Sequence, residues 1–389
     1  MATLRVVVDP LISADGGGIG RYTRELTSQL IETAPRGCDV EGIVASHAAE
    51  KYERLEAQLP GLVRLHTVPL RRRELARAWQ YGIGIPIGPG MIHSPGLLAP
   101  LMKHDRTIDG TQVVVTIHDT LAYTHPESLK PRDVQWQKAM IKRARKHADA
   151  IVVPTHAVAT QLGERFDFGD RIRVISGAPA ATLRLGSASD ADERARALGL
   201  PPRYILAMGG IDPRKGLRSL IAAMALPETE GLPLLIAGAE AAPAEEAAGA
   251  VGVETAAGVA AAAGLAENRV RMLGQLDDAD LAVALDRAAV FVYPSLAEGF
   301  GLPVIEAFRF GTPVVHSDDP ALTEVADGAG LSVPRADAAG YPRRLADAIG
   351  RILGDAALAE KLGVLGQDRA RAFSWRDSAE RIWQLHADL

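Results

Sequence analysis

The chain has 389 residues, of which 47% are hydrophobic and 23% charged, and its formal net charge is −5. This length exceeds what one hydrophobic core usually holds, so we expect two domains of an ordinary globular protein. The charge balance gives no reason to expect nucleic acid as a partner. No apolar run reaches the roughly 18 residues of a membrane span, and the first ten residues lack a signal-peptide pattern, so we expect a cytoplasmic protein.

Disulfide and metal chemistry are also disfavoured by the sequence. Cys38 is the only cysteine, which leaves no intrachain disulfide and no cysteine-based metal site. The ten histidines include no His-x-x-x-His pair. We therefore expect a protein without a metal ion or another cofactor.

The chain opens with a predicted strand, a glycine-rich loop and a helix. Residues 4–8 are a short β-branched run, residues 16–20 read Gly-Gly-Gly-Ile-Gly, and a helix is predicted over residues 21–32. The dinucleotide fingerprint is not met, because no glycine follows Gly20 by three residues. The loop is either a phosphate or sugar loop or a plain tight connection.

A histidine and an aspartate follow the most apolar of the next predicted strands. These strands lie at residues 40–44, 91–93, 113–117, 150–153 and 173–175 and alternate with helical stretches, which is typical of a parallel sheet covered on both faces. His118 and Asp119 follow residues 113–117, at the carboxyl edge where ligands bind in open α/β folds. The alternative for His118 is a purely structural role.

Two predicted helices of this first half are strongly basic. Residues 70–79 contain Arg71, Arg72, Arg73 and Arg77, and residues 135–148 contain Lys138, Lys142, Arg143, Arg145, Lys146 and His147. Such charges usually form a solvated surface. The alternative is peripheral contact with anionic lipid or with an anionic acceptor, since each basic residue near such a surface contributes about 1 kcal/mol.

Residues 187–202 mix small, charged and proline residues, so we place the domain boundary there. The N-terminal domain then spans residues 1–186 and the C-terminal domain residues 200–370. The second domain repeats the alternation, with strands predicted at residues 204–208, 234–237, 270–273, 290–293 and 313–316 and a helix at residues 217–225. Residues 241–264 are alanine-rich and predict a surface helix interrupted at Gly249 and Gly252.

A second glycine loop, GGIDPRKG at residues 209–216, follows the first strand of this domain. Arg214 and Lys215 are adjacent cations at a strand end, and that placement favours an anionic partner such as a diphosphate. Arginine offers a planar fork to phosphate oxygens and lysine a point charge. The alternative is a pair of solvated loop charges.

The stretch YPSLAEGFGLPVIEA at residues 293–307 passes from a strand through a glycine loop into a helix predicted to begin near Leu302. The backbone N–H groups at such a helix start can hold phosphate. Glu298 and Glu306 cannot neutralise phosphate, but carboxylates accept hydrogen bonds from ribose or sugar hydroxyls. The alternative is that Glu298 caps the helix and Glu306 is a solvated helix residue.

These glutamates, separated by seven residues around Gly-Phe-Gly-Leu-Pro and followed by Gly-Thr-Pro-Val-Val at residues 311–315, resemble the donor-site motif of the retaining family 4 glycosyltransferases. The glycine loop at residues 16–20, the strand-end His118 and Pro-Arg-Lys-Gly at residues 213–216 precede this motif in the chain, in the order typical of the family. The resemblance implies the α/β GT-B fold, two Rossmann-like domains facing across a cleft, with a terminal helix at residues 373–389 that packs back on the first.

The resemblance also implies a reaction and a site. A hexose passes with retention from a nucleoside diphosphate sugar to a hydroxyl of a glycan, a lipid-linked glycan or a small molecule, without a metal; the mannosyltransferase-like branch favours GDP-mannose, then a UDP-hexose. The implied catalytic residues are His118, Asp119, Arg214, Lys215 and Glu298. The implied donor-binding residues are Gly18, Gly20, Gly210, Arg214, Lys215, Glu298, Gly299, Phe300, Gly301, Leu302 and Glu306.

One departure from the family pattern concerns Gly210, which stands where many relatives carry an arginine. This leaves the individual role of Arg214 open. A nucleotide-sugar epimerase of the same fold is the alternative function, and a non-enzymatic sugar-nucleotide sensor is a third reading.

Overall fold

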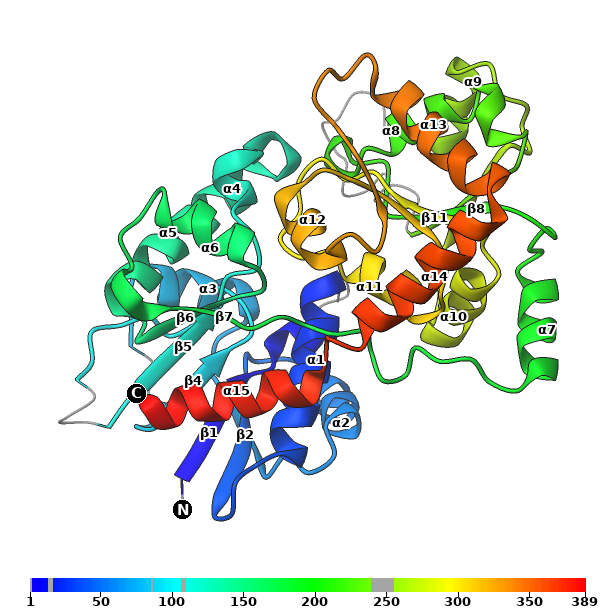
Figure 1. Cartoon of the computed structure of the whole chain (residues 1–389). Helices are drawn as coiled ribbons and strands as arrows, with labels where there is room; N and C mark the ends of the chain where they lie inside the picture. The colour runs from blue at the N-terminus through cyan, green and yellow to red at the C-terminus, as the bar shows by residue number, and fades with distance from the viewer. Residues whose placement is uncertain (1, 13–16, 85–86, 106–109, 239–254) are drawn as a thin grey trace. The chain divides into compact units, whose positions relative to one another are not determined.

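The structure, a computed structural model, describes residues 2–12, 17–84, 87–105, 110–238 and 255–389. The chain folds into two compact units (Figure 1). Unit 1 comprises Met1–Ala178 and Phe373–Leu389, and unit 2 comprises Pro179–Ala372. Among the described residues, no helix is both long and apolar enough to cross a bilayer.

Unit 1 is built on a seven-stranded sheet in the order β3-β2-β1-β4-β5-β6-β7, and all its strand pairs are parallel. The strands are β1 (Ala2–Val7), β2 (Cys38–Val44), β3 (Arg64–Thr67), β4 (Met91–Ser94), β5 (Gln112–Thr116), β6 (Ala150–Val153) and β7 (Ile172–Val174). The central strands β4 and β5 are buried along almost their whole length because helices cover both faces of the sheet.

The helices of unit 1 form two layers. One layer, with α1 (Gly17–Glu32), α2 (Ala49–Gln58) and α15 (Trp375–Asp388), contributes Leu26, Leu55 and Trp383 to a core on one face. The other layer, with α3 (Arg72–Gln80), α5 (Pro131–His147) and α6 (His156–Gly163), contributes Trp79 and Met140 to the core on the other face. The short α4 (Leu121–Thr124) precedes α5.

The helix α15 closes the first of these layers although it lies far away in sequence. In Figure 1 it runs, in red, beside the blue α1. Trp383 Nε1 donates to the Leu30 carbonyl at 3.1 Å, and Ser378 Oγ donates to the Ser176 carbonyl at 2.7 Å. The side chain of Ile382 is fully buried, so α15 is part of the core of unit 1 and not a surface helix.

Unit 2 repeats the plan with a six-stranded sheet in the order β10-β9-β8-β11-β12-β13, again with parallel pairs. Its strands are β8 (Ile205–Met208), β9 (Leu234–Ala237), β10 (Val270–Gly274), β11 (Val290–Tyr293), β12 (Val314–Ser317) and β13 (Leu331–Val333). Its helices are α7 (Ala188–Ala197), α8 (Leu217–Ala223), α9 (Ala256–Ala262), α10 (Asp278–Asp286), α11 (Leu302–Arg309), α12 (Pro320–Ala326), α13 (Tyr341–Gly354) and α14 (Ala356–Ala370). The predicted α/β class with two parallel-sheet domains is confirmed.

Several elements differ from the sequence-based prediction. The edge strands β3 and β13 escape a search for apolar runs because they are short and half-exposed. Residues 187–202 are not a free linker, since α7 packs in unit 2 through Ala195 against Val283, and Arg194 pairs with Asp280 at 2.8 Å. The chain therefore changes units at 178/179, earlier than the composition suggested. Of the alanine-rich stretch, residues 241–254 lie outside the described residues, and α9 accounts for residues 256–262.

Two buried histidines face each other between the sheet of unit 1 and α15. The rings of His93 on β4 and His386 lie 5.9 Å apart. Within the described residues, both nitrogens of His93 and Nε2 of His386 lack hydrogen-bond partners, while His386 Nδ1 lies 3.3 Å from Gln112 Oε1. Burial lowers the pKa of both imidazoles, that of His386 to about 4. Both rings are therefore neutral in the folded protein at pH 7.

This pair predicts a pH dependence of the stability of unit 1. Between pH 7 and pH 5 the unfolded chain protonates His386 near its ordinary pKa of about 6.5, whereas the folded chain does not protonate it until about pH 4. Protons thus favour unfolding, and we expect a loss of about 2 kcal/mol over this window from His386 alone. His386→Gln should flatten the dependence.

The measurement is urea unfolding at the two pH values followed by tryptophan fluorescence, since Trp79, Trp136, Trp375 and Trp383 are all the tryptophans and all lie in unit 1. An equally steep pH dependence in the variant would contradict the assignment.

Candidate active site

The strand order of unit 2 reverses between β8 and β11. From β8 the sheet continues through β9 to one edge, and from β11 it continues through β12 to the other. The loops that leave the carboxyl ends of these two neighbouring strands are residues 209–216 and 294–301. In open α/β sheets ligands bind at such a topological switch point, so the two glycine loops singled out in the sequence lie at the expected place.

The first loop turns through a single 3-10 turn, Pro213–Lys215, which brings it against the second loop. Asp212 Oδ1 accepts the Arg214 N–H at 2.8 Å, and the Leu296 N–H donates to the Arg214 carbonyl at 2.7 Å. Gly216 has a φ of +65°, and a Cβ there would lie 2.1 Å from the Pro294 carbonyl oxygen. The approach of the two loops therefore requires glycine at this position.

Glu298 is the centre of the polar cluster that joins the loops. Its Oε1 accepts hydrogen bonds from Lys215 Nζ at 2.6 Å, Arg214 Nη1 at 3.1 Å, Tyr293 Oη at 2.9 Å and Ser295 Oγ at 2.7 Å. The two cations are thus not solvated loop charges. The expectation that Glu298 points to ligand hydroxyls also needs revision, because in this structure its Oε1 is occupied by protein donors.

The electrostatics of this cluster leave it cationic at neutral pH. Burial alone would raise the pKa of the Glu298 carboxyl, but the charges of Lys215 and Arg214 outweigh it and lower the pKa to about 2. Burial would lower the pKa of Lys215, but Tyr293 and Glu298 outweigh it and raise the pKa above its ordinary value. Two positive charges against one negative charge leave one positive charge to interact with an anion.

The start of α11 lies at the end of the second loop. Gly301 is its N-cap with a φ of +95°, and no side chain within the described chain caps the helix there. Gly299 and Gly301 are buried, Phe300 and Leu302 are half-buried, and α11 begins at Leu302 as predicted. Glu306 is only 1% exposed, so the alternative of a solvated helix residue is wrong for it.

His118 lies at the carboxyl end of β5 in unit 1. Its Nε2 is 2.7 Å from the Pro95 carbonyl oxygen, and since a carbonyl only accepts, Nε2 carries the proton and donates it. Burial lowers the pKa of His118, so the ring is neutral at pH 7 and Nδ1 presents a lone pair. The ring meets Tyr22 edge-on at 4.6 Å, which fixes its orientation.

The remaining predicted residues occupy simpler positions. Asp119 Oδ1 accepts the Leu121 N–H at 3.0 Å, so this carboxylate orders the start of α4. Gly18 and Gly20, expected in a loop, lie in the first turn of α1, which begins at Gly17. Gly20 is buried, and a Cβ there would lie 3.4 Å from the Pro10 carbonyl oxygen. Gly210 is half-buried between β8 and the 3-10 turn.

Several side chains that complete the unit 2 cluster were not predicted from the sequence. Tyr293 and Ser295 flank the end of β11 and both donate to Glu298. Arg335, after β13, pairs with the buried carboxylate of Asp319 at 2.7 Å. It also donates to the Leu296 carbonyl and so holds the second loop in place. Only Tyr293 could have been found from the sequence, because its hydroxyl group stands at the end of an apolar strand. Arg335 could not, because it lies far from the two loops in the sequence.

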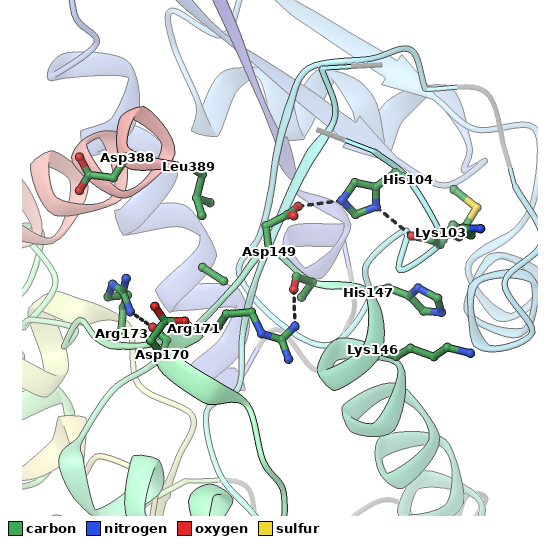
Figure 2. A pocket seen from close by; sticks show the side chains of 13 residues that line it. Lys103, His104, Lys146, His147, Asp149, Asp170, Arg171, Arg173, Asp388 and Leu389 are labelled. Carbon is green, nitrogen blue, oxygen red and sulfur yellow. Dashed lines mark hydrogen bonds and ion pairs between the residues drawn. The ribbon is translucent and has the colours of Figure 1, made fainter. Parts of the chain in front are cut away.

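A separate cavity of about 540 Å³ lies in unit 1 at the amino ends of β6 and β7, the sheet edge opposite to His118. Figure 2 shows that His104, Asp149, Arg171 and Arg173 on its wall are bonded to protein groups. His104 Nε2 lies 2.8 Å from Asp149 Oδ2, and Arg171 Nη1 donates to the Ala148 carbonyl at 2.8 Å. These contacts connect loops to the end of α5, so we assign the cavity no chemistry.

Comparison with known proteins gives a consistent class for both units. The profile of the "Glycosyltransferase Family 4" domain matches residues 16–178, and that of "Glycosyl transferases group 1" matches residues 189–368. An O-antigen chain mannosyltransferase B of Escherichia coli is 29% identical over 68% of this chain and 68% of its own length. A D-inositol 3-phosphate glycosyltransferase of a Nocardioides species is 28% identical over 96% of this chain and 82% of its own.

The solved structures give the same fold. Anabaena HepE, solved in complex with UDP and glucose, superposes with a TM-score of 0.73 at 17% identity, covering all of both chains. With the strand orders above, this likeness establishes the GT-B fold. The two profiles and the relatives together make both units of the chain similar to group 1 glycosyltransferases of that fold.

Proposed function

We propose that the protein transfers a hexose, with mannose the first candidate, from a nucleoside diphosphate sugar to an acceptor hydroxyl with retention at the anomeric carbon. The observation that carries the proposal is the cluster of Arg214, Lys215 and Glu298, which keeps one net positive charge at the switch point of unit 2. The mannosyl donor is favoured by the named activity of the E. coli relative, and a UDP-hexose is the second candidate because HepE was solved with UDP.

In this proposal the diphosphate lies between Lys215 and the start of α11. Negative charge grows on the leaving phosphate as the bond to the sugar breaks, and a fixed cation with helix amides stabilises that charge without reorganisation. Glu298 holds both cations in place, so it is a positioning residue as well as a counter-ion. Glu306 and the amides of residues 299–302 complete the donor site in unit 2.

We assign His118 to the transferred sugar. A neutral imidazole whose Nε2–H is committed to Pro95 accepts a hydroxyl hydrogen bond at Nδ1, and because burial lowers the pKa of His118 the ring is a weak base. The proton of the acceptor hydroxyl then passes to an oxygen of the leaving diphosphate, while the acceptor oxygen bonds to the anomeric carbon on the face that the diphosphate leaves. Arg214, Lys215 and Asp119 need no change of protonation in this step.

His118→Ala should lower the turnover number by about 100-fold and change the nucleotide dissociation constant less than threefold, because contacts to the reacting sugar matter most in the transition state. Steady-state transfer kinetics and nucleotide titration measure the two effects. His118→Asn, which keeps a donor for the Pro95 carbonyl, serves as the conservative comparison. A wild-type turnover in the alanine variant would remove His118 from the site.

The experiment that tests the proposal is a donor panel. The full chain is incubated with GDP-mannose, UDP-glucose and other nucleotide sugars, with glycan and lipid-linked acceptors, and the stereochemistry of the product is read by NMR. We expect release of the nucleoside diphosphate and an α-linked product from an α-linked donor. An epimerised sugar formed without acceptor would instead indicate the epimerase, and binding without turnover of any donor would indicate a sensor.

A further inference from the structure

We propose that unit 1 carries a membrane-binding face, formed by the outer sides of α3 and α5 and the turn after α3, that docks on anionic lipid. Six residues define this face: Arg73, Arg77, Tyr81, Ile83, Lys142 and Lys146, all exposed. The inference concerns association with a bilayer surface and does not depend on the identity of the transferred sugar.

The helices α3 and α5 lie next to each other on the same face of the sheet. Both contribute buried residues to one core, and Trp136 Nε1 on α5 donates to the Ala76 carbonyl on α3 at 3.4 Å. The turn after α3 abuts α5 as well, because a Cβ on Gly82 would lie 2.4 Å from Arg143 Nη2. The outer sides of the two helices and this turn therefore form one continuous surface.

Two large apolar side chains are exposed on this surface. Tyr81 is 74% exposed, the highest value among the large apolar residues that the structure describes, and Ile83 is 58% exposed. Arg73, Arg77 and Tyr81 are spaced at i, i+4 and i+8, so they project from one side of the helix and its end. Exposed tyrosine and isoleucine beside cations suit the interface of a bilayer, where an aromatic ring with a polar tip is favoured.

The charged side chains of this surface are basic. Arg73, Arg77, Lys142 and Lys146 form no ion pair among the described residues. The segment 134–147 of α5 contains no acidic residue, and Glu74, the only acid of α3, accepts the backbone N–H of Arg71 at the helix start. Figure 2 shows Lys146 at the end of α5 on the same side of the cavity as Lys103. Four uncompensated cations around two apolar residues match an anionic bilayer rather than a neutral one.

Stable attachment to a bilayer usually needs two weak signals, and this face combines an apolar one with a basic one. The whole chain has a net charge of −5. The excess of cations is therefore local to this face and does not reflect a generally basic surface. An acidic protein would also complement the cations. It would not account for the exposed side chains of Tyr81 and Ile83, which suit contact with lipid chains.

The test is co-sedimentation of the full chain with vesicles of phosphatidylglycerol and phosphatidylcholine, without donor or acceptor. We expect binding to mixed anionic vesicles, no binding to pure phosphatidylcholine, and loss of at least tenfold in the partition coefficient at 0.5 M salt. The variants Tyr81→Ser/Ile83→Ser and Arg73→Gln/Arg77→Gln should each lower the coefficient about tenfold or more.

Val63→Ser is the matched control, because Val63 is 60% exposed in unit 1 but lies outside α3, α5 and the turn. It should bind vesicles like the wild type, and circular dichroism verifies that all variants are folded. Absence of wild-type binding to anionic vesicles, equal binding to both lipids, or equal losses in the control and the paired variants would each overturn the proposal. Capture of an acidic protein without vesicle binding would indicate the other kind of partner.

Discussion

Replacing Lys215 by methionine is expected to lower the rate of sugar transfer at saturating donor by about 100- to 1,000-fold. The ammonium group lies 2.6 Å from Glu298 Oε1 and supplies one of the two positive charges of the cluster. Without it, Arg214 and Glu298 balance each other, and no net charge remains to stabilise the leaving diphosphate. Rapid-quench measurement of single turnovers separates this effect from nucleotide binding, which should weaken by about tenfold.

Two comparisons make the Lys215 result specific. Lys215→Arg keeps the charge but not the geometry, so we expect an intermediate rate. Lys361→Met removes an exposed lysine from α14 of the same unit and should leave the rate unchanged. A Lys215→Met enzyme with more than a third of the wild-type single-turnover rate would show that the cluster stabilises the fold and not the leaving group.

Gly216→Ala is expected to destabilise unit 2 by about 3 kcal/mol and to abolish nucleotide binding. A side chain at a φ of +65° is strained, and the added Cβ would lie 2.1 Å from the Pro294 carbonyl oxygen, a backbone atom that no rotamer change can move. The two loops would have to separate, which would break the contacts of Lys215 and Arg214 with Glu298.

Calorimetry is the suitable measurement for Gly216→Ala, because the tryptophans all report on unit 1 and their fluorescence gives an internal reference for that unit. We expect the unit 2 transition to shift and the tryptophan transition to stay. Gly354→Ala is the control, since Gly354 ends helix α13 with no atom within 4 Å of an added Cβ, so it should be neutral. Wild-type nucleotide affinity in Gly216→Ala would contradict the tight approach of the loops.

The sequence predicted much of the fold because the sheets are parallel and buried. Residues 290–293 are a continuous apolar run and residues 113–117 are apolar except for Thr116, and the runs end at Pro294 and His118. His118 and the helix start at Leu302 were placed correctly on that basis. Edge strands such as β13 lack this signal, because half of their surface faces water.

The partners within the site could not be predicted, because they depend on contacts between distant segments. Glu298 was assigned to ligand hydroxyls, yet it meets Lys215 and Arg214 from 83 and 84 residues away. Nothing local distinguishes a glutamate that faces a sugar from one that holds two cations. The composition placed the boundary at residues 187–202 rather than at 178/179 for a similar reason. The helix α7 is polar in sequence, and its buried residues Ala191 and Ala195 pack against Val283 of α10.

The position of α15 determines the order in which the two units can be completed during synthesis. Its Trp383 bonds to Leu30 across 353 residues, while every residue of unit 2 lies between those two positions. The whole of unit 2 therefore leaves the ribosome before the helix that closes the core of unit 1. The apolar surface of α1 that α15 covers stays open for that interval, so the first unit to be made is the last to become a finished domain.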